Sequence, residues 1–281
     1  MKLLRYGPKG KEKPGLLDKE GRIRDLSAIV PDITGAAIST AGLARLRKIK
    51  PESLPLVRGK PRIGACIANP QKFIAIGLNY SDHAAESGLQ VPKEPVVFTK
   101  QVSCLSGPND DVTIPPKSKK SDWEVELGVI IGTKAKNIRK ADALKHVAGY
   151  CTINDLSERE FQAERSGQWT KGKSYDTFGP VGPWLVTADE VKDPQKLTMW
   201  LELNGKRVQN GSTATMVFGV AHIVAYLSEF FTLMPGDIIT TGTPPGVGMG
   251  MKPQRFLKPG DTMRLGIDGL GEQSQKVVRD K

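Results

Sequence analysis

The sequence predicts a mainly β protein of the α+β class, with a small N-terminal α+β domain at residues 1–70 and a larger domain at residues 71–281. Three observations support this prediction. Beyond residue 71, short apolar segments of strand length alternate with loops rich in glycine and proline. A single long helical segment is evident, at residues 217–233. Strands and helices do not alternate in the βαβ order of a parallel sheet with crossover helices.

The small N-terminal domain is predicted to combine three short strands with one helix. The strands are expected at residues 2–5, 15–17 and 22–26. Ser39 is a helix-capping residue, and apolar residues recur after it at helical spacing until Pro51 ends the helix. Several prolines then punctuate the connection to the larger domain, and nothing in these residues suggests chemistry.

The larger domain is predicted to contain many short strands. They are expected at residues 73–77, 96–99, 112–114, 124–131, 149–153, 182–186, 199–204, 237–241 and 262–267. Asn204 and Gly205 form a typical type I′ turn, which predicts a hairpin between residues 201–204 and 207–210. The helix at 217–233 carries apolar residues nearly all round, so we expect it to be buried against the sheets.

The composition is that of an ordinary soluble protein, with 38% hydrophobic and 25% charged residues. The formal charge of +11 comes from Lys and Arg residues scattered along the chain, without a basic helix interleaved with aromatic residues. We therefore expect no nucleic-acid partner and a surface that attracts small anions. The three widely spaced cysteines indicate reduced thiols and a cytoplasmic location. The N-terminus lacks the apolar run of a signal peptide, and no segment reaches the length of a membrane span, so no membrane partner is expected.

Two glutamates stand on one face of the predicted strand at 124–131. Trp123, Val125 and Leu127 alternate with Glu124 and Glu126, as the period of a strand requires. Two neighbouring carboxylates in a half-buried strand repel each other and lose hydration unless a cation lies between them or one binds a proton. A divalent metal ion is the simplest resolution. The alternative is an edge strand with a solvated acidic face.

Asp155 follows the apolar strand at 149–153 directly. A carboxylate at the end of a buried strand is well placed to join Glu124 and Glu126. Three oxygen ligands suit Mg²⁺ or Mn²⁺ better than Zn²⁺, which favours His and Cys. The alternative is that Asp155 caps a helix that begins near residue 157.

His83 and Glu86 form a candidate catalytic pair. Within one helical turn, residues three apart share a face, so the carboxylate would hold the imidazole and raise its basicity. An exposed surface pair is the alternative. Of the other two histidines, His146 lies in a polar helical stretch, and His222 lies on the apolar helix, where we expect it to be bonded within the core.

Residues 167–174 match the phosphate-binding signature G-x-x-x-x-G-K-S. A phosphate loop follows a buried strand and opens a helix, but residues 158–165 are too charged for such a strand, and the Gly/Pro run at 178–183 cannot be a helix. We reject the match and keep Lys173 as a candidate site residue.

The small-residue loop at 240–248 follows a predicted strand. Its backbone N–H groups and hydroxyls could bind a carboxylate, or the loop could be only a tight turn.

Taken in order, these segments resemble the fumarylacetoacetate hydrolase family. Five ordered blocks carry the resemblance, which covers nearly everything from Phe73 to the C-terminus. The blocks are 77–80 with His83 and Glu86, 123–127, 154–155 with Ser157 and Arg159, 173–174 with 176–180, and 235–237 leading to 241–247.

The resemblance implies a homodimer whose catalytic domains have a mixed β-roll fold, with one divalent metal ion in each subunit. Glu124, Glu126 and Asp155 would hold this ion, which we expect to be Mg²⁺ or Mn²⁺, with Ca²⁺ as a substitute in crystals. Within the family, the small N-terminal domain and the overall length look like bacterial hydrolases of 2,4-diketo-3-deoxy acids of rhamnose or fucose. That group is often labelled ureidoglycolate lyase.

The implied substrate is a small anionic 2-keto acid of the acylpyruvate type. His83, oriented by Glu86, would remove a proton from water, and the water would attack the 4-keto carbon. Cleavage of the carbon–carbon bond would expel a pyruvate enolate, whose charge the metal and Lys173 would stabilise. By resemblance, the substrate-binding residues would be Arg159, Gln162 and Thr243.

Other activities are open to the same metal–enolate chemistry. A lyase or decarboxylase would act on ureidoglycolate or oxaloacetate, and an isomerase or dehydratase would act on an unsaturated or β-hydroxy acid. His83 and Glu86 discriminate between these activities, because only hydrolysis needs an activated water. A non-catalytic protein with a structural metal is disfavoured, because a three-ligand oxygen site leaves open positions.

Overall fold

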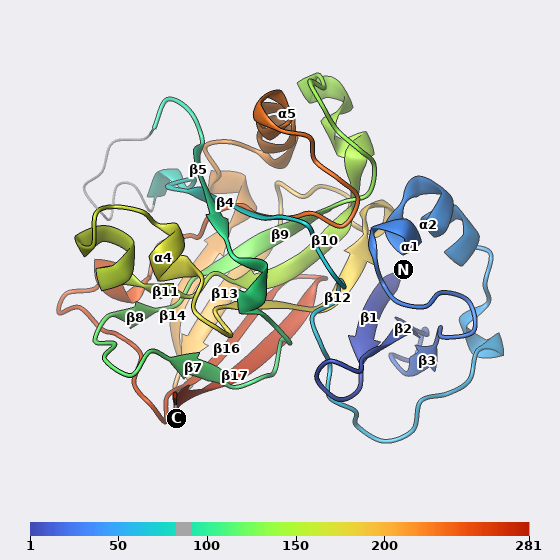
Figure 1. Ribbon diagram of the computed structural model, residues 1–281, viewed down its shortest axis with the longest axis horizontal. Coiled ribbons are helices and arrows are strands. Elements are labelled where there is room, and N and C mark those ends of the chain that lie inside the picture. Colours follow the sequence, from blue (N-terminus) through green and yellow to red (C-terminus); the bar gives the residue numbers. More distant parts are fainter. Residues whose placement is uncertain (83–91, 281) are drawn as a thin grey trace.

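The computed structural model describes residues 1–82 and 92–280, and its largest element is a mixed β-sheet (Figure 1). In this part of the chain the sheet has ten strands, in the order β3-β2-β1-β12-β10-β9-β15-β4-β5, with β6 paired to β12 outside this path. The strands are β1 (Lys2–Tyr6), β2 (Lys13–Leu17), β3 (Ile23–Asp25), β4 (Phe73–Gly77), β5 (Val96–Lys100), β6 (Leu105–Ser106), β9 (Val125–Ile131), β10 (Val147–Asn154), β12 (Gly179–Thr187) and β15 (Ile238–Thr240).

A second sheet packs against the first, and their buried side chains form one apolar core. Its order is β14-β13-β16-β17-β7, and β9 and β10 of the large sheet contact β13, β16 and β17. These strands are β7 (Val112–Ile114), β13 (Thr198–Leu203), β14 (Lys206–Ser212), β16 (Thr262–Ile267) and β17 (Gly271–Arg279). The short strands β8 (Ser121–Asp122) and β11 (Ser157–Glu158) pair separately. The predicted mainly β class is therefore confirmed.

In the part of the chain that the structure describes, the helices are few and short. They are α1 (Gly35–Ile38), α2 (Thr40–Leu46), α4 (Thr170–Lys173) and α5 (Val220–Phe230). Shorter 3₁₀ segments lie at Pro51–Ser53, Val102–Cys104, Lys140–His146, Ala188–Glu190, Thr213–Thr215 and Gly248–Gly250, and a π turn at Glu160–Glu164.

The long helix is shorter and less buried than its apolar sequence predicted. It spans 220–230, because the residues on both sides of this range are extended. One face packs into the core, but His222 stacks between Phe218 and Tyr226 on the other face, and Phe230 is 59% exposed. Partial burial lowers the pKa of His222. The expectation that the whole helix is buried was wrong, because the sheets cover only one face.

The N-terminal strands form as predicted and continue the large sheet. β1 pairs antiparallel with β12, and β2 and β3 follow in the same sheet. Ser39 caps α2, since its Oγ accepts a hydrogen bond from the N–H of Gly42 at 3.1 Å. The helix ends at Leu46, earlier than expected. The division into domains at residue 70 stays a prediction.

The hairpin formed by β13 and β14 confirms the predicted turn. Asn204 and Gly205 have φ angles of 52° and 76°, and a type I′ turn requires positive φ at both positions.

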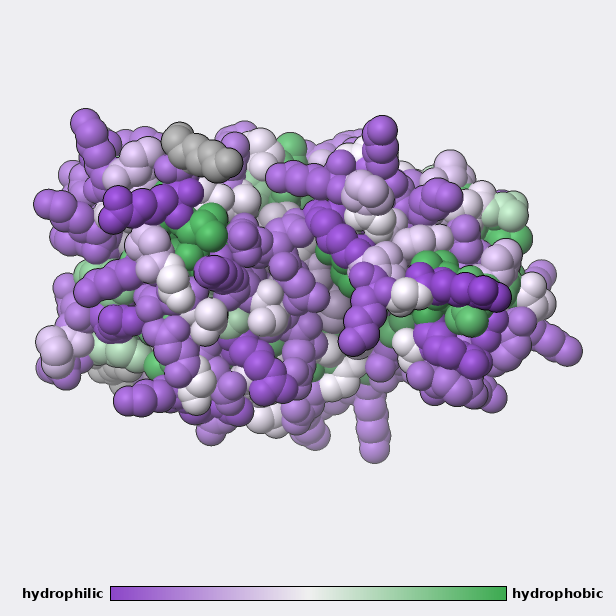
Figure 2. Space-filling model, turned by 90° about the horizontal axis from the view of Figure 1, so that it is seen from below, coloured by the Kyte–Doolittle hydropathy of each residue, from purple (hydrophilic) through white to green (hydrophobic). Residues whose placement is uncertain are grey.

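The face shown in Figure 2 is mostly hydrophilic, and hydrophobic residues appear on it in small patches between hydrophilic ones. Among the described residues, no helix has both the length and the apolar character that crossing a membrane would need.

Candidate active site

The strand that carries the glutamates lies inside the large sheet. β9 is hydrogen-bonded to β10 on one side and to β15 on the other, and all seven of its residues are buried. Glu124 directly precedes β9 and Glu126 lies within it, with only 5% and 2% of their surfaces exposed. The alternative of an edge strand with a solvated acidic face was therefore wrong.

Asp155 joins the two glutamates through the pairing of β9 with β10. The register places Ile153 opposite Glu126, and the N–H of Asp155 donates to the carbonyl of Glu124 at 2.9 Å. Carboxylate oxygens of the three acidic residues all lie within 4.8 Å of one another. First-shell oxygens at about 2.0–2.6 Å from one cation can span such a distance. The Asp155 carboxylate contacts lysine ammonium groups, so the helix-cap reading was wrong.

Two predicted cationic residues bind this carboxylate cluster. Lys173 Nζ donates to Glu124 and, at 2.8 Å, to Asp155. Arg159 donates to Glu124 at 2.7 Å, to Asp122 at 2.8 Å and to Gln162 at 3.0 Å. Burial would raise the pKa of Glu124, but the nearby charges of Lys173 and Arg159 outweigh it and lower this pKa to about 2. Burial would lower the pKa of Lys173, yet its carboxylate neighbours raise it, so the ammonium stays charged.

Glu126 has the opposite electrostatic character. Burial raises its pKa well above the usual value, and the charges of Asp155 and Glu124 raise it further. One of its oxygens accepts hydrogen bonds from Thr240 Oγ1 at 2.5 Å and from the N–H of Gly242 at 2.7 Å. A hard divalent cation would relieve the repulsion among these three carboxylates, and an all-carboxylate donor set suits Mg²⁺ or Mn²⁺. The residues present therefore fit the expected ion.

Lys100 belongs to this cluster and was missed in the sequence. Its Nζ donates to Asp155 Oδ1 at 2.6 Å and to the carbonyl of Lys173, and the residue is only 2% exposed. It ends β5, where it pairs with Phe73 of β4, and its ammonium group lies 5.8 Å from the centre of that ring. A lysine after a predicted strand is usually a surface residue, so the local pattern contained no signal for this contact.

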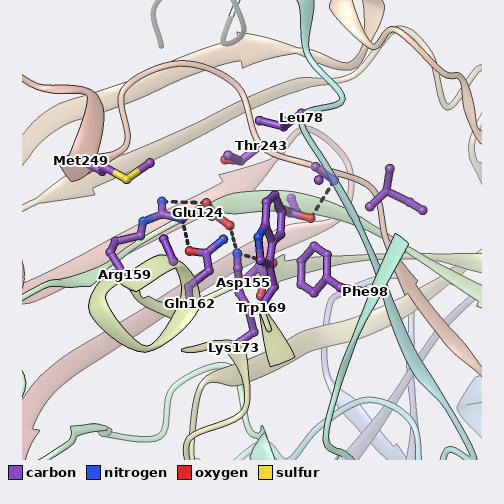
Figure 3. Close-up of a pocket in the computed structure, with 15 residues that line it drawn as sticks. Leu78, Phe98, Glu124, Asp155, Arg159, Gln162, Trp169, Lys173, Thr243 and Met249 are labelled. Atoms are coloured by element: carbon purple, nitrogen blue, oxygen red, sulfur yellow. Dashed lines mark hydrogen bonds and ion pairs between the residues drawn. The ribbon is translucent and has the colours of Figure 1, made fainter. Parts of the chain in front are cut away.

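The predicted substrate-binding residues line the same cavity as the carboxylates (Figure 3). Arg159 and Gln162 come from the segment after β11, and Thr243 comes from the loop after β15. The Thr243 hydroxyl donates to the carbonyl of Val125 at 2.9 Å and accepts from Gln209 at 2.8 Å. The loop at 240–248 therefore bonds to β9 and to Glu126. The substrate contacts assigned to these residues stay predictions.

The cavity has a volume of about 150 Å³, and its lining includes carboxylates and basic groups. Among the described residues, the lining also includes a set of apolar side chains that the sequence did not single out. These are Ile76, Leu78, Phe98, Ala163, Trp169 and Met249. Figure 3 shows Phe98 and Trp169 together at one end, Met249 at the other, and Glu124 between them.

The candidate histidines lie outside the cavity lining or outside the described residues. His83 and Glu86 lie outside the described residues, so their role stays a prediction. His146 Nδ1 contacts the carbonyls of Thr133 and Lys134, away from the cavity. Residues 167–174 do not follow a strand, which confirms that they are no phosphate loop, and α4 within them directs Lys173 into the site.

Comparisons with known proteins find a matching family model and similar solved structures. Residues 72–278 match the family model described as "Fumarylacetoacetate (FAA) hydrolase C-terminal". A Burkholderia ambifaria protein named "Putative hydrolase" is 68% identical over 278 residues, which is 99% of each chain. Each of two solved structures aligns with this chain over the full length of both chains. These are fumarylacetoacetate hydrolase from Exiguobacterium antarcticum (33% identity, TM-score 0.87) and maleylpyruvate hydrolase from Sphingobium sp. SYK-6 with manganese(II) and pyruvate (31%, 0.83).

A third similar solved structure is named as an isomerase and not as a hydrolase. It is a probable 2-hydroxyhepta-2,4-diene-1,7-dioate isomerase from Mycobacterium abscessus, with 33% identity, a TM-score of 0.84 and full coverage of both chains.

Proposed function

Because this chain belongs to the fumarylacetoacetate hydrolase family, we propose that it is a metal-dependent hydrolase of acylpyruvate-type 2,4-diketo acids. It would cleave the carbon–carbon bond next to the 4-keto carbon and release pyruvate. One observation carries the proposal: Glu124, Glu126 and Asp155 meet within 4.8 Å beside a cavity. The similarity to the Sphingobium maleylpyruvate hydrolase, a complex with manganese(II) and pyruvate, supports it.

The three carboxylates would hold Mg²⁺ or Mn²⁺. When bound, such an ion polarises a substrate carbonyl and stabilises the negative charge of an enolate. Lys173 adds a fixed positive charge at the same place, because its raised pKa keeps the ammonium protonated. Arg159 is held by Asp122 and Glu124, and it orients the amide of Gln162, whose nitrogen would donate to a substrate oxygen.

Hydrolysis also needs a base that removes a proton from water. We assign this role to His83, oriented by Glu86, on the sequence pattern alone. Without this base the same cavity would favour isomerisation, dehydration or decarboxylation of a 2-keto acid. Isomerisation is the second candidate, supported by the similarity to the Mycobacterium abscessus isomerase.

The test is a steady-state screen of the purified protein with Mg²⁺, with Mn²⁺ and with EDTA. The substrates are acetylpyruvate, oxaloacetate, ureidoglycolate, a 2,4-diketo-3-deoxy sugar acid and 2-hydroxyhepta-2,4-dienedioate. We expect release of pyruvate from the acylpyruvates, and loss of this activity in EDTA with the fold retained. Failure to cleave any acylpyruvate with either ion would overturn the proposal, and unfolding in EDTA would favour a structural metal instead.

The His83→Ala variant tests the assigned base. It should lose hydrolysis while keeping its affinity for Mn²⁺, and His146→Ala is the matched control because His146 lies away from the cavity. Hydrolysis by His83→Ala at the native rate would show that another group activates the water.

We also propose that the protein is a cytoplasmic homodimer, which the family resemblance supports. Light scattering coupled to gel filtration measures the oligomeric state directly.

A further inference from the structure

We propose that the acyl half of the substrate is an apolar planar group, aromatic or unsaturated, and not a polyhydroxylated sugar chain. This inference rests on the proposed function, because it names the substrate class of the same cavity. It differs from the sugar-acid specificity that the resemblance implied. It rests on the aromatic side chains that lie beside the carboxylates and Lys173 in this cavity.

Two aromatic rings lie directly beside the charged cluster. Phe98 of β5 and Trp169, just before α4, are 5.2 Å apart between ring centroids and inclined by 60°. Lys173 Nζ lies 5.2 Å from the centroid of Phe98, and the same ammonium group donates to Glu124 and Asp155. In the proposed binding mode, a substrate whose keto acid end lies at the carboxylates extends its other end across these rings, which favour apolar and planar groups.

The position of Trp169 depends on Gly77. A Cβ atom at this glycine would lie 2.4 Å from Cζ3 and 3.0 Å from Cη2 of the indole. Real side-chain atoms do not approach so closely, so the indole reaches this place only because residue 77 has no side chain. Leu78, next in the chain, lines the same cavity. The aromatic side is thus formed jointly by β4, β5 and the segment before α4.

Most polar side chains in the described part of the lining are bonded to one another, and the amide nitrogen of Gln162 is the donor assigned above to a substrate oxygen. Arg159 donates to Asp122, Glu124 and Gln162, Lys173 donates to two carboxylates, and the Thr243 hydroxyl donates to a backbone carbonyl. In the described part of the lining, Leu78, Phe98, Trp169 and Met249 offer hydroxyl groups no strong hydrogen-bond acceptor. Placing several hydroxyls against these side chains removes water from them without replacing its hydrogen bonds, which opposes binding of a sugar chain.

The experiment compares kcat/KM for benzoylpyruvate, acetylpyruvate and a 2,4-diketo-3-deoxy sugar acid. We expect benzoylpyruvate to be preferred over the sugar acid by about tenfold or more, since the apolar side chains among the described lining residues offer few hydrogen-bond partners to substrate hydroxyls. Trp169→Ala and Gly77→Ala should both reduce the preference, the first by removing the ring and the second by displacing it. Trp169→Phe should retain most of it. Trp200→Phe is the matched control, because Trp200 lies in β13 between Arg207 and Arg264. Circular dichroism confirms that each variant is folded.

The outcomes distinguish failure of this inference from failure of the proposed function. If the sugar acid is cleaved as efficiently as benzoylpyruvate, or if the preference survives in both Trp169→Ala and Gly77→Ala, the inference is overturned while the proposed function stands. If no acylpyruvate is cleaved, the proposed function fails, and binding decides the inference. In that case phenylpyruvate should bind more tightly than 2-keto-3-deoxygluconate in a fluorescence titration, and equal or reversed affinities would overturn the inference.

Discussion

Lys100 Nζ donates a hydrogen bond to the Oδ1 atom of Asp155 at 2.6 Å. Lys173 contacts the other oxygen, Oδ2, at 2.8 Å, so both oxygens of one buried carboxylate are bound by ammonium groups. Lys100 also donates to the carbonyl of Lys173. This lysine therefore fixes the position of Asp155 and of the chain that carries Lys173.

Replacing Lys100 with methionine should destabilise the metal-free protein. Removal of one partner from a buried ion pair typically costs ~3 kcal/mol or more in the free energy of unfolding, because the other charge stays buried. Chemical denaturation in EDTA measures this loss. Lys120→Met is the matched control: Lys120 pairs with Glu164 at the surface, and such pairs contribute about 0–1 kcal/mol. Added Mn²⁺ should restore part of the stability of Lys100→Met, and equal stabilities of the two variants would contradict the role of Lys100.

Glu124→Gln and Glu126→Gln should differ in the metal-free protein although both would lose affinity for Mn²⁺. The first breaks contacts with Lys173 and Arg159, and we expect it to cost ~3 kcal/mol in the free energy of unfolding. The second replaces a carboxyl group whose pKa is already raised by burial. Glutamine can still accept hydrogen bonds from Thr240 and Gly242, so Glu126→Gln should cost no more than about 1 kcal/mol in the free energy of unfolding. Denaturation in EDTA and calorimetric titration with Mn²⁺ provide the two measurements. Equal destabilisation by both changes would contradict this assignment.

Asp122→Asn should raise KM for the acylpyruvate more than it lowers kcat. Asp122 accepts from Arg159 Nε at 2.8 Å and from the N–H groups of Gly248 and Met249 at 2.6 and 3.0 Å. It therefore joins the arginine to the loop that carries Met249, and its loss should weaken binding by about tenfold. Steady-state kinetics of Asp122→Asn measure both constants. Asp110→Asn is the control, because Asp110 binds Arg62 in a different part of the molecule. An unchanged KM would mean that the loop holds its position without Asp122.

Asp18→Asn should reduce the loss of stability in acid. Burial would raise the pKa of Asp18, but hydrogen bonds from the N–H of Arg22 and from the side chains of Arg24 and Arg22 lower it from 3.8 to about 2. A lowered pKa in the folded state contributes stability that is present above pH 3.8 and is lost as the pH falls toward 2. Thermal unfolding midpoints between pH 5 and pH 2 should therefore fall less steeply in Asp18→Asn than in the native chain. Parallel curves would show that Asp18 does not contribute to this loss.

Elements that depend on neighbouring residues were predictable. The alternation of Glu124 and Glu126 with apolar residues predicted one acidic face of a strand, and the model confirms it. The Asn204–Gly205 turn was equally clear, because only certain residues adopt positive φ. His83 and Glu86 lie outside the described residues, so their pairing stays a prediction.

The site itself required contacts between distant parts of the chain. Asp155 reads equally well as a helix cap, and the register of β10 against β9 places it beside Glu124. Lys100 reads as a surface lysine, and pairing of β5 with β4 buries it. Trp169 stands inside a rejected phosphate signature, and it contacts the cavity because Gly77 leaves room for it.

Residue periodicity and turn chemistry thus specify the strands, the hairpin and the acidic face, since each depends on a few adjacent residues. The meeting of three carboxylates, the burial of Lys100 and the aromatic side of the cavity depend on strand pairing over long separations. No local pattern encodes those distances, so only the folded chain shows which charges neutralise one another and which rings line the cavity.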